Sequence, residues 1–200
     1  KATADATPNF QFVLDSLASK DTTSHKPLDL AIHSLIIRNG NIRYDQHDIP
    51  TPSRFTPQHL HLTDVSTHIM LNSLKDDSLN LFVKKLSFKE RAGLEIKSLS
   101  FSVIADKQHG RLDDFCLQLP HSTLNIPSIR ATYQSRDKKI DMGTLQFEGN
   151  IAPSSITPCD LSCFIGSLDK MDTPVNLYAS FHGTGTLATV SKLNISTCQD

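Results

Sequence analysis

One stretch of the sequence gathers side chains that bind metal ions. His59, His61, Asp64 and His68 lie close together, and His59 and His61 fall on one face of a strand because side chains alternate along it. An open metal site usually recruits a further ligand that hydrogen bonds hold in place. The stretch shows no such ligand, so we interpret these residues as a solvated strand face.

The four cysteines, Cys116, Cys159, Cys163 and Cys198, are too few and too scattered for a disulfide framework in 200 residues. Cys159 and Cys163 are one helical turn apart and can share a ligand, but Cys163 borders an apolar stripe. We interpret both as buried or inert thiols. The spacing matches no zinc ribbon, so we expect no metal site.

No motif indicates catalysis. The run from Gly183 to Ala188 matches a dinucleotide fingerprint in letters, but a strand pattern follows it, whereas that phosphate site needs a helix N-terminus. We expect its glycines to form a turn or allow close backbone approach. Ser122 follows His121 without a nucleophile elbow or an evident acidic partner. We therefore expect that the chain is not an enzyme and uses no cofactor.

The composition excludes several classes of partner. Lys and Arg number 20 against 21 Asp and Glu, without a basic block, so we expect no nucleic-acid binding. The sequence contains no run of about 20 apolar residues, which is the length that a helix needs to cross a bilayer. Apolar residues make up 38% of the chain and Trp is absent, which predicts a thin core. The first residues carry no signal-peptide pattern, and we interpret the chain as a fragment or processed product.

Period-two alternation predicts strands through most of residues 28–200. Leu28 to Ile37 and Ile42 to Tyr44 flank Asn39-Gly40, which favours a tight hairpin turn. A long strand follows from Leu60 to Leu71, with one phase slip near Asp64. Further strands are expected at 79–88, 94–103, 112–119, 122–133, 140–151, 175–181 and 185–195.

Two segments show helical spacing instead. Residues 8–18 predict a short amphipathic helix, and a polar linker follows up to residue 27. Thr157 as N-cap, Pro158 at the first position and an apolar stripe of Leu161, Phe164, Ile165 and Leu168 predict a second helix near 158–170. The sequence thus divides into residues 1–27, helix and linker, and residues 28–200, a β-rich domain with one helix lying across the sheet.

One phrase recurs in five strands: an apolar residue, two others, Leu, one other, and an apolar residue. It occurs at 32–37, 83–88, 96–101, 142–147 and 190–195. An odd offset puts apolar residues on opposite faces unless the backbone bulges. The phrase therefore predicts either ordinary bulges of a twisted sheet or aligned kinks that curl one wide sheet into a trough.

Five segments resemble the TamB (translocation and assembly module) family of the AsmA-like superfamily, in its Bacteroidetes-type forms. They are residues 9–17; residues 35–45; residues 88–101; residues 117–126; and residues 156–164 together with 181–187. They are mostly apolar spacing with one Gly, Pro or Asp each, and their order along the chain carries the resemblance. The family has no catalytic residues to transfer.

The resemblance implies a long, curved antiparallel sheet, an open half-pipe or groove with one or two short covering helices. It also implies an internal periplasmic segment of an inner-membrane-anchored protein whose apolar groove binds or conducts phospholipids or other acyl chains between inner and outer membranes. Residues expected to line the groove are Leu60, Leu62, Leu79, Leu81, Leu86, Phe88, Leu99 and Phe101.

Two other functions remain open at this stage. The sheet edges can help outer-membrane β-barrel proteins assemble by strand addition, which uses unpaired backbone groups rather than an apolar lining. A carbohydrate-binding or hydrolytic β-domain would need convergent carboxylates and aromatic platforms, which a chain with three Tyr and no Trp supports weakly.

Overall fold

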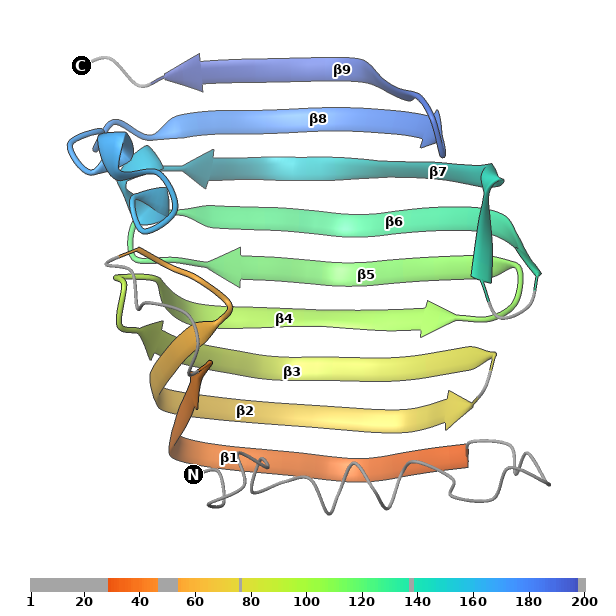
Figure 1. Ribbon diagram of the computed structural model, residues 1–200. Helices are drawn as coiled ribbons and strands as arrows, with labels where there is room; N and C mark the ends of the chain where they lie inside the picture. Colours follow the sequence, from red (N-terminus) through yellow and green to blue (C-terminus); the bar gives the residue numbers. More distant parts are fainter. Residues whose placement is uncertain (1–28, 47–53, 76, 137–138, 198–200) are drawn as a thin grey trace.

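The protein folds into one open antiparallel sheet of nine strands, each paired with its neighbours in sequence (Figure 1). The computed structural model describes residues 29–46, 54–75, 77–136 and 139–197. The strands are β1 (Asp29–Asp45), β2 (His59–Lys75), β3 (Ser78–Glu90), β4 (Glu95–Ala105), β5 (His109–Gln118), β6 (Thr123–Arg136), β7 (Lys139–Ile156), β8 (Val175–Thr184) and β9 (Ala188–Thr197). The prediction of a mainly β chain with an open antiparallel sheet is confirmed.

The predicted helix near residues 158–170 is wrong. The segment forms two short 3-10 helices instead, η1 (Pro158–Leu161) and η2 (Gly166–Leu168), and the described residues contain no α-helix. The Thr157 hydroxyl donates to the backbone oxygen of His121 rather than capping a helix. Phe164 and Ile165 stay exposed, so the expected apolar stripe is not buried. The other predicted helix, residues 8–18, lies outside the described residues.

Asn39-Gly40 does not form a hairpin turn, contrary to the prediction. Strand β1 runs through both residues and pairs with β2 on either side of them. Asn39 has the expected positive φ, 53°. There it accommodates an irregularity within one strand, because the register against β2 shifts between Ile37 and Gly40.

Positive φ values occur where the apolar alternation slips. Asp64 (φ 55°) lies between Leu62 and Val65, and Asp114 (φ 53°) lies between Leu112 and Phe115. The left-handed conformation resets the pleat, so apolar residues three apart emerge on the same side. Asn and Asp tolerate this conformation better than most residues. The slip predicted near Asp64 is confirmed.

The recurring phrase marks register shifts, as predicted, but the sheet does not curl into a trough. In β1 the shift begins at Ile32, which pairs with Leu71 and through it with Leu81. In β3 the shift begins two residues beyond Leu81, at Val83. Since the shifts lie at different levels on different strands, their local bends do not combine into one fold line. The expected half-pipe is thus corrected to an open sheet that is neither closed nor curled.

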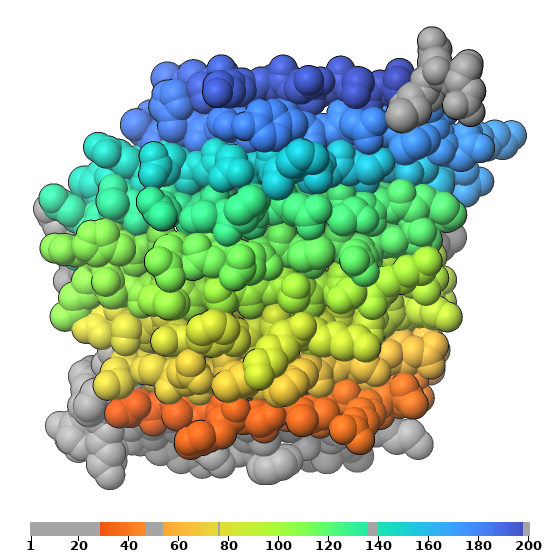
Figure 2. Space-filling model, turned by 180° about the vertical axis from the view of Figure 1, so that it is seen from behind, coloured from red at the N-terminus to blue at the C-terminus, as the bar shows by residue number. Residues whose placement is uncertain are grey.

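The core is as thin as the composition predicts. Among the described residues only five apolar side chains are buried, and none is less than 2% exposed. They are Val65, Val83, Leu119, Cys163 and Ala179. Residues 54–58 and the loop with η1 and η2 lie at one end of the strands (Figure 1). Viewed from behind, the strands form successive bands in the order of the chain (Figure 2).

Candidate functional site

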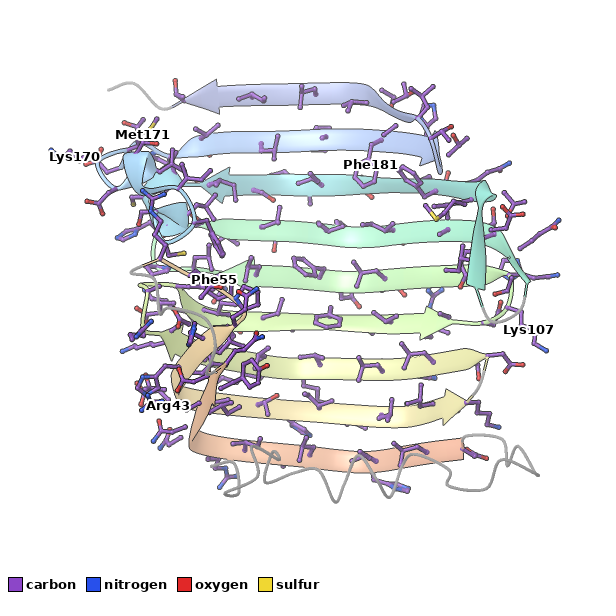
Figure 3. All side chains as sticks on the ribbon, viewed as in Figure 1. Arg43, Phe55, Lys107, Lys170, Met171 and Phe181 are labelled. Atoms are coloured by element: carbon purple, nitrogen blue, oxygen red, sulfur yellow. The ribbon has the colours of Figure 1, made fainter. Side chains whose placement is uncertain are left out.

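One face of the sheet is apolar across all nine strands. Cross-strand pairing connects one residue of each strand into a continuous row without a polar side chain: Ile32, Leu71, Leu81, Val103, Leu112, Ile129, Gly149, Phe181 and Val190. Directly paired residues share a face of the sheet. We call this side the apolar face; Phe181 projects from it in Figure 3.

All eight residues predicted to line a lipid groove lie on the apolar face. The pairs Phe101 with Val83 and Leu86 with Leu99 connect β3 to β4, and Leu81 continues the row described above. Leu60 and Leu62 precede the slip at Asp64, and Leu79 and Phe88 alternate with Leu81 and Leu86. Each of the eight is half-buried. The structure brings these side chains together on a surface rather than in a groove.

Aromatic rings pair on the apolar face, once between β4 and β5 and once between β7 and β8. The rings of Phe101 and Phe115 stack with centroids 6.2 Å apart, and those of Phe147 and Phe181 lie 6.3 Å apart. Such pairs hold ring positions more firmly than area burial alone does. Phe115, Phe147 and Phe181 were not among the predicted residues. Phe147 and Phe181 follow from the alternation in their strands, whereas Phe115 comes after the slip at Asp114.

Both ends of the apolar face carry a cover of described residues. At one end, Phe55 packs edge-on against Phe164 with centroids 5.1 Å apart. At the other, Tyr133 and Ile140 of the β6–β7 hairpin border a cavity of about 470 Å³. Its lining also includes Leu74, Leu79 and Ala105 together with Lys75, Asp77, Ser78, Asp106, Lys107 and Ser135. Lys107 pairs with Asp77 at 2.9 Å, so the cavity has an apolar part and a polar part that carries both charges.

The opposite face is polar along one row from β4 to β9, which runs through Ser102, Asp113, Ser128, Asn150, Ser180 and Lys192. On β3 and β2 the same row continues through Phe82 and Met70, so the opposite face is mixed there. A shallower polar cavity of about 460 Å³ lies over β6 to β9, bordered by Arg130, Glu148 and His182. From β4 to β9 the two faces thus differ along these rows as in an amphipathic sheet, with one side polar and one side apolar.

The histidines of β2 do not converge on a metal site. His59 is buried, at 5% exposure, and its Nδ1 lies 3.2 Å from Asp45 Oδ1. His68 contacts Ser34, whereas Asp64 points toward Lys89. Interpreting this stretch as a solvated face was therefore wrong for His59, which is buried beside Asp45. Hydrogen bonds from Arg43 and then His59 lower the pKa of Asp45.

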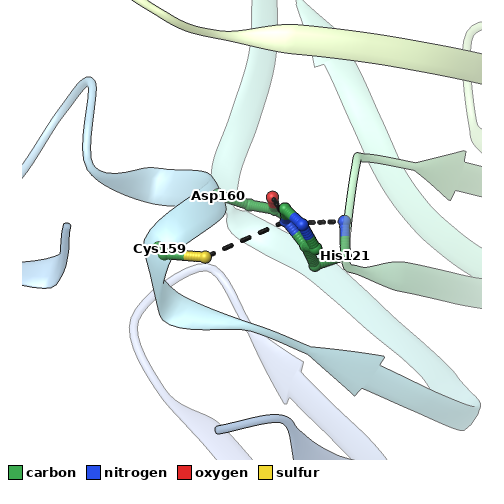
Figure 4. A group of neighbouring side chains, drawn as sticks. All are labelled: His121, Cys159 and Asp160. Atoms are coloured by element: carbon green, nitrogen blue, oxygen red, sulfur yellow. Dashed lines mark hydrogen bonds and ion pairs between the residues drawn. The ribbon is translucent and has the colours of Figure 1, made fainter. Parts of the chain in front are cut away.

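A different cluster assembles His121, Cys159 and Asp160, with one ligand atom of each within 4.8 Å of the others (Figure 4). His121 lies in the β5–β6 turn, and the other two lie in η1. His121 Nδ1 is 2.9 Å from Asp160 Oδ1 and 3.9 Å from Cys159 Sγ. The expectation that Ser122 lacks an acidic partner was wrong, since its hydroxyl donates to Asp160 Oδ2 at 2.6 Å.

The cluster is not arranged as a nucleophile with its base. The Ser122 hydroxyl donates to a carboxylate instead of an imidazole, and Cys159 and Asp160 approach the same ring nitrogen of His121. Burial disfavours the charged Asp160 carboxylate, but hydrogen bonds from Ser122 and His121 outweigh it and lower its pKa below 3.8. No local sequence signal could reveal the cluster, because the partners lie almost forty positions apart.

The other cysteines have separate environments. Cys163 is buried, at 5% exposure, and burial raises the pKa of its thiol. Cys116 is half-buried and pairs across the sheet with Ser100 and Asn125 on the polar face. Cys163 fits the predicted buried thiol, whereas Cys159 has polar neighbours. Cys198 lies outside the described residues.

No protein-family model, curated protein or solved structure matches the chain. In the part of the chain that the structure describes, no helix is long and apolar enough to span a membrane. The Gly183–Ala188 segment connects β8 to β9 as a hairpin, which confirms the turn expected there. That the chain is neither an enzyme nor a nucleic-acid-binding protein stays a prediction.

Proposed function

We propose that the apolar face binds the acyl chains of lipids and conducts them across the strands. The observation that carries this proposal is the apolar row from Ile32 to Val190, unbroken over nine strands and without a second layer of described residues over its middle. An exposed acyl chain costs about 0.8 kcal/mol per CH₂ in water. A continuous apolar surface removes that cost at every step.

The direction of the row suits transport as well as binding. Eight gaps between neighbouring strands, at about 4.8 Å each, give a path of roughly 38 Å perpendicular to the strands. Covers at both strand ends leave the middle of the face for a ligand. The resemblance to the TamB family supports the same proposal and supplies its setting: the periplasm, in an inner-membrane-anchored protein that moves lipid toward the outer membrane.

The decisive experiment compares Phe101→Asp with Phe82→Asp. Both changes replace a half-buried phenylalanine by a charge, on adjacent strands, but Phe101 lies on the apolar face and Phe82 pairs with Ser102 on the other. Binding of a fluorescent fatty acid to the full chain is measured by titration. We expect Phe101→Asp to weaken binding at least tenfold and Phe82→Asp to change it less than threefold, because one charge costs more than 1.4 kcal/mol at an apolar contact.

A further variant guards against loss of folding. Leu193→Asp changes an edge residue that is 59% exposed on the same face, so it should weaken fatty-acid binding while leaving the circular dichroism spectrum unchanged. Native mass spectrometry of protein from the envelope should show bound phospholipid. Folded wild-type chain that binds neither probe would contradict the proposal.

Strand addition is a second candidate, favoured by the open edges. All ten residues of β9 are exposed, and most of β1 is exposed too. Successive residues direct their N–H groups to alternate sides of a strand, so one of Leu193→Pro and Asn194→Pro blocks the free edge while the other breaks the β8 ladder. Under strand addition, the edge-blocking variant stops assembly of an outer-membrane β-barrel. Under lipid conduction alone, it has no effect on assembly.

A further inference from the structure

We propose that His121, Cys159 and Asp160 form a zinc site that ties the β5–β6 turn to the connection between β7 and β8. This inference is independent of lipid binding. The three side chains offer the nitrogen, sulfur and oxygen ligands that Zn²⁺ takes in proteins. They come from chain segments almost forty residues apart and meet at one point (Figure 4).

The distances between ligand atoms are close to those that the ion requires. With Zn–N and Zn–O near 2.0–2.1 Å and Zn–S near 2.3 Å, a tetrahedron puts N and S about 3.6 Å apart and N and O about 3.4 Å apart. The corresponding distances are 3.9 Å from His121 Nδ1 to Cys159 Sγ and 2.9 Å to Asp160 Oδ1. Shifts of about half an ångström bring the imidazole nitrogen to these distances from its two partners. The Cys159 sulfur and the Asp160 oxygen lie within 4.8 Å of each other, against about 3.6 Å in the tetrahedron, so the Cys159 side chain closes by up to about 1.2 Å as the ion binds.

A second layer of hydrogen bonds holds the carboxylate. The Asp160 side chain is only 2% exposed, and its Oδ2 accepts the Ser122 hydroxyl at 2.6 Å and the His121 backbone N–H at 3.0 Å. Ser122 in turn accepts the Thr157 N–H at 2.9 Å. Supporting partners of this kind orient metal ligands in proteins. They leave Oδ1 directed at the imidazole, where the ion would lie.

The approach to the site is open and the protons balance. The His121 side chain is 64% exposed, so an ion reaches the cluster from solvent and water completes the coordination. On binding, the proton that Nδ1 shares with Asp160 Oδ1 leaves Nδ1, so that the neutral imidazole carries its one proton on Nε2 and gives Nδ1 to the ion. The Cys159 thiol releases its proton to solvent and binds as thiolate, and Asp160 binds as carboxylate.

Cobalt substitution tests the assignment directly. The full chain, without a polyhistidine tag and with thiols kept reduced, is titrated with Co²⁺ and then with Zn²⁺. A thiolate-to-cobalt charge-transfer band is expected for the wild type and for Cys116→Ser, whose thiol lies on the polar face. Zn²⁺ should displace Co²⁺ and abolish the band. Cys159→Ser and His121→Ala should show no band.

A further variant tests whether the cluster binds metal or only connects the two segments by hydrogen bonds. Ser122→Ala removes a hydrogen bond to Asp160 and should lower zinc affinity about 10- to 100-fold, whereas Ser128→Ala, a serine outside the cluster, should not change it. If the folded wild type gives no band and no zinc binding, or if Cys159→Ser keeps the band, the proposal is overturned. The cluster then only connects the β5–β6 turn to η1 by hydrogen bonds.

Discussion

Gly149 faces Phe181 across the β7–β8 ladder, and the missing side chain of the glycine makes room for the ring. A Cβ at Gly149 would lie 2.8 Å from Phe181 Cζ. The adjacent pair reverses the roles: Phe147 faces Gly183, where a Cβ would lie 2.6 Å from Phe147 Cζ. Aromatic residues that cover cross-strand glycines compensate for the glycines' missing contacts. The two pairs thus keep the apolar face continuous at positions without side chains.

Alanine substitutions at two glycines should differ in their cost to stability, because one new Cβ meets fixed backbone and the other meets a side chain that can move. A Cβ at Gly185 would overlap the backbone carbonyl of Met142, whereas at Gly149 it meets the end of the Phe181 ring. We expect Gly185→Ala to lower the free energy of unfolding by about 1–3 kcal/mol, because the backbone must shift. Gly149→Ala should cost less, since the ring can turn. Urea unfolding measures both, and equal costs would contradict this account.

Shortening an apolar side chain should lower the free energy of unfolding far more in the core than at the edge of the sheet. Val83 is 5% exposed, and Val83→Ala removes two carbon groups from the small core. The expected loss of unfolding free energy is about 2 kcal/mol. Leu193→Ala, at the exposed edge, should change it by less than about 0.5 kcal/mol. A comparable loss in both variants would show that the apolar face is covered out to β9.

Asp114 should tolerate glycine and resist valine. Its φ of 53° lies in the left-handed region, which costs a residue with a Cβ roughly 1–2 kcal/mol. We expect Asp114→Gly to preserve or raise the free energy of unfolding, and Asp114→Val to lower it by about that amount. Thermal unfolding followed by circular dichroism gives the order of the three proteins. A more stable valine variant would exclude the left-handed conformation.

Two serine variants should behave differently. Ser122 is buried, donates to Asp160 and accepts from Thr157, so Ser122→Ala should cost about 1–3 kcal/mol. The Ser128 hydroxyl is buried without a hydrogen-bond partner among the described residues. Ser128→Ala should therefore be neutral or slightly stabilising. The measurement is urea unfolding of metal-free protein, and a larger loss at Ser128 would refute the reasoning.

The β4–β5 turn should lose stability in acid. Asp106 Oδ1 accepts the backbone N–H groups of Gln108 at 2.7 Å and His109 at 2.8 Å, which lowers the pKa of Asp106 below 3.8. A carboxylate with a lowered folded-state pKa stabilises the fold above its unfolded pKa. That contribution disappears as the pH falls through the folded pKa.

Asp106→Asn isolates this contribution, because asparagine keeps an acceptor oxygen but does not titrate. The wild type should be the more stable protein at about pH 7, and the difference should shrink toward about pH 2. Urea unfolding across this range tests the prediction. A difference that stays constant with pH would assign the effect to the amide itself.

Period-two alternation was sufficient to predict most strands, because each pairs with its sequence neighbour and one face is apolar. Asn39-Gly40 shows where local chemistry misleads: the pair favours a turn, but β2 is long enough to pair with residues on both sides of it. The helix near 158–170 failed for a related reason. Thr157, which was expected to cap the helix, and its neighbour Asp160 form tertiary hydrogen bonds to the β5–β6 turn instead.

The residues of the apolar face were predictable and the cluster was not. Leu81 and Phe101 follow from alternation, which depends only on neighbours in sequence. The meeting of His121 with Cys159 depends on how β6 and β7 return the chain to the same end of the sheet. The predicted trough was wrong because the sequence shows that a strand contains a register shift but not where that shift lies relative to the shift in another strand. The shifts that begin at Ile32 and at Val83 are an example.

The neighbour-to-neighbour strand order makes the length of the sheet adjustable. Every ladder joins strands adjacent in sequence, so contact order is low and pairing can propagate from any hairpin. Deleting or duplicating a hairpin of two strands preserves the direction of all the others and alters the width by only about 9.6 Å. The width of such a sheet can therefore be changed, by evolution or by design, in steps of one hairpin.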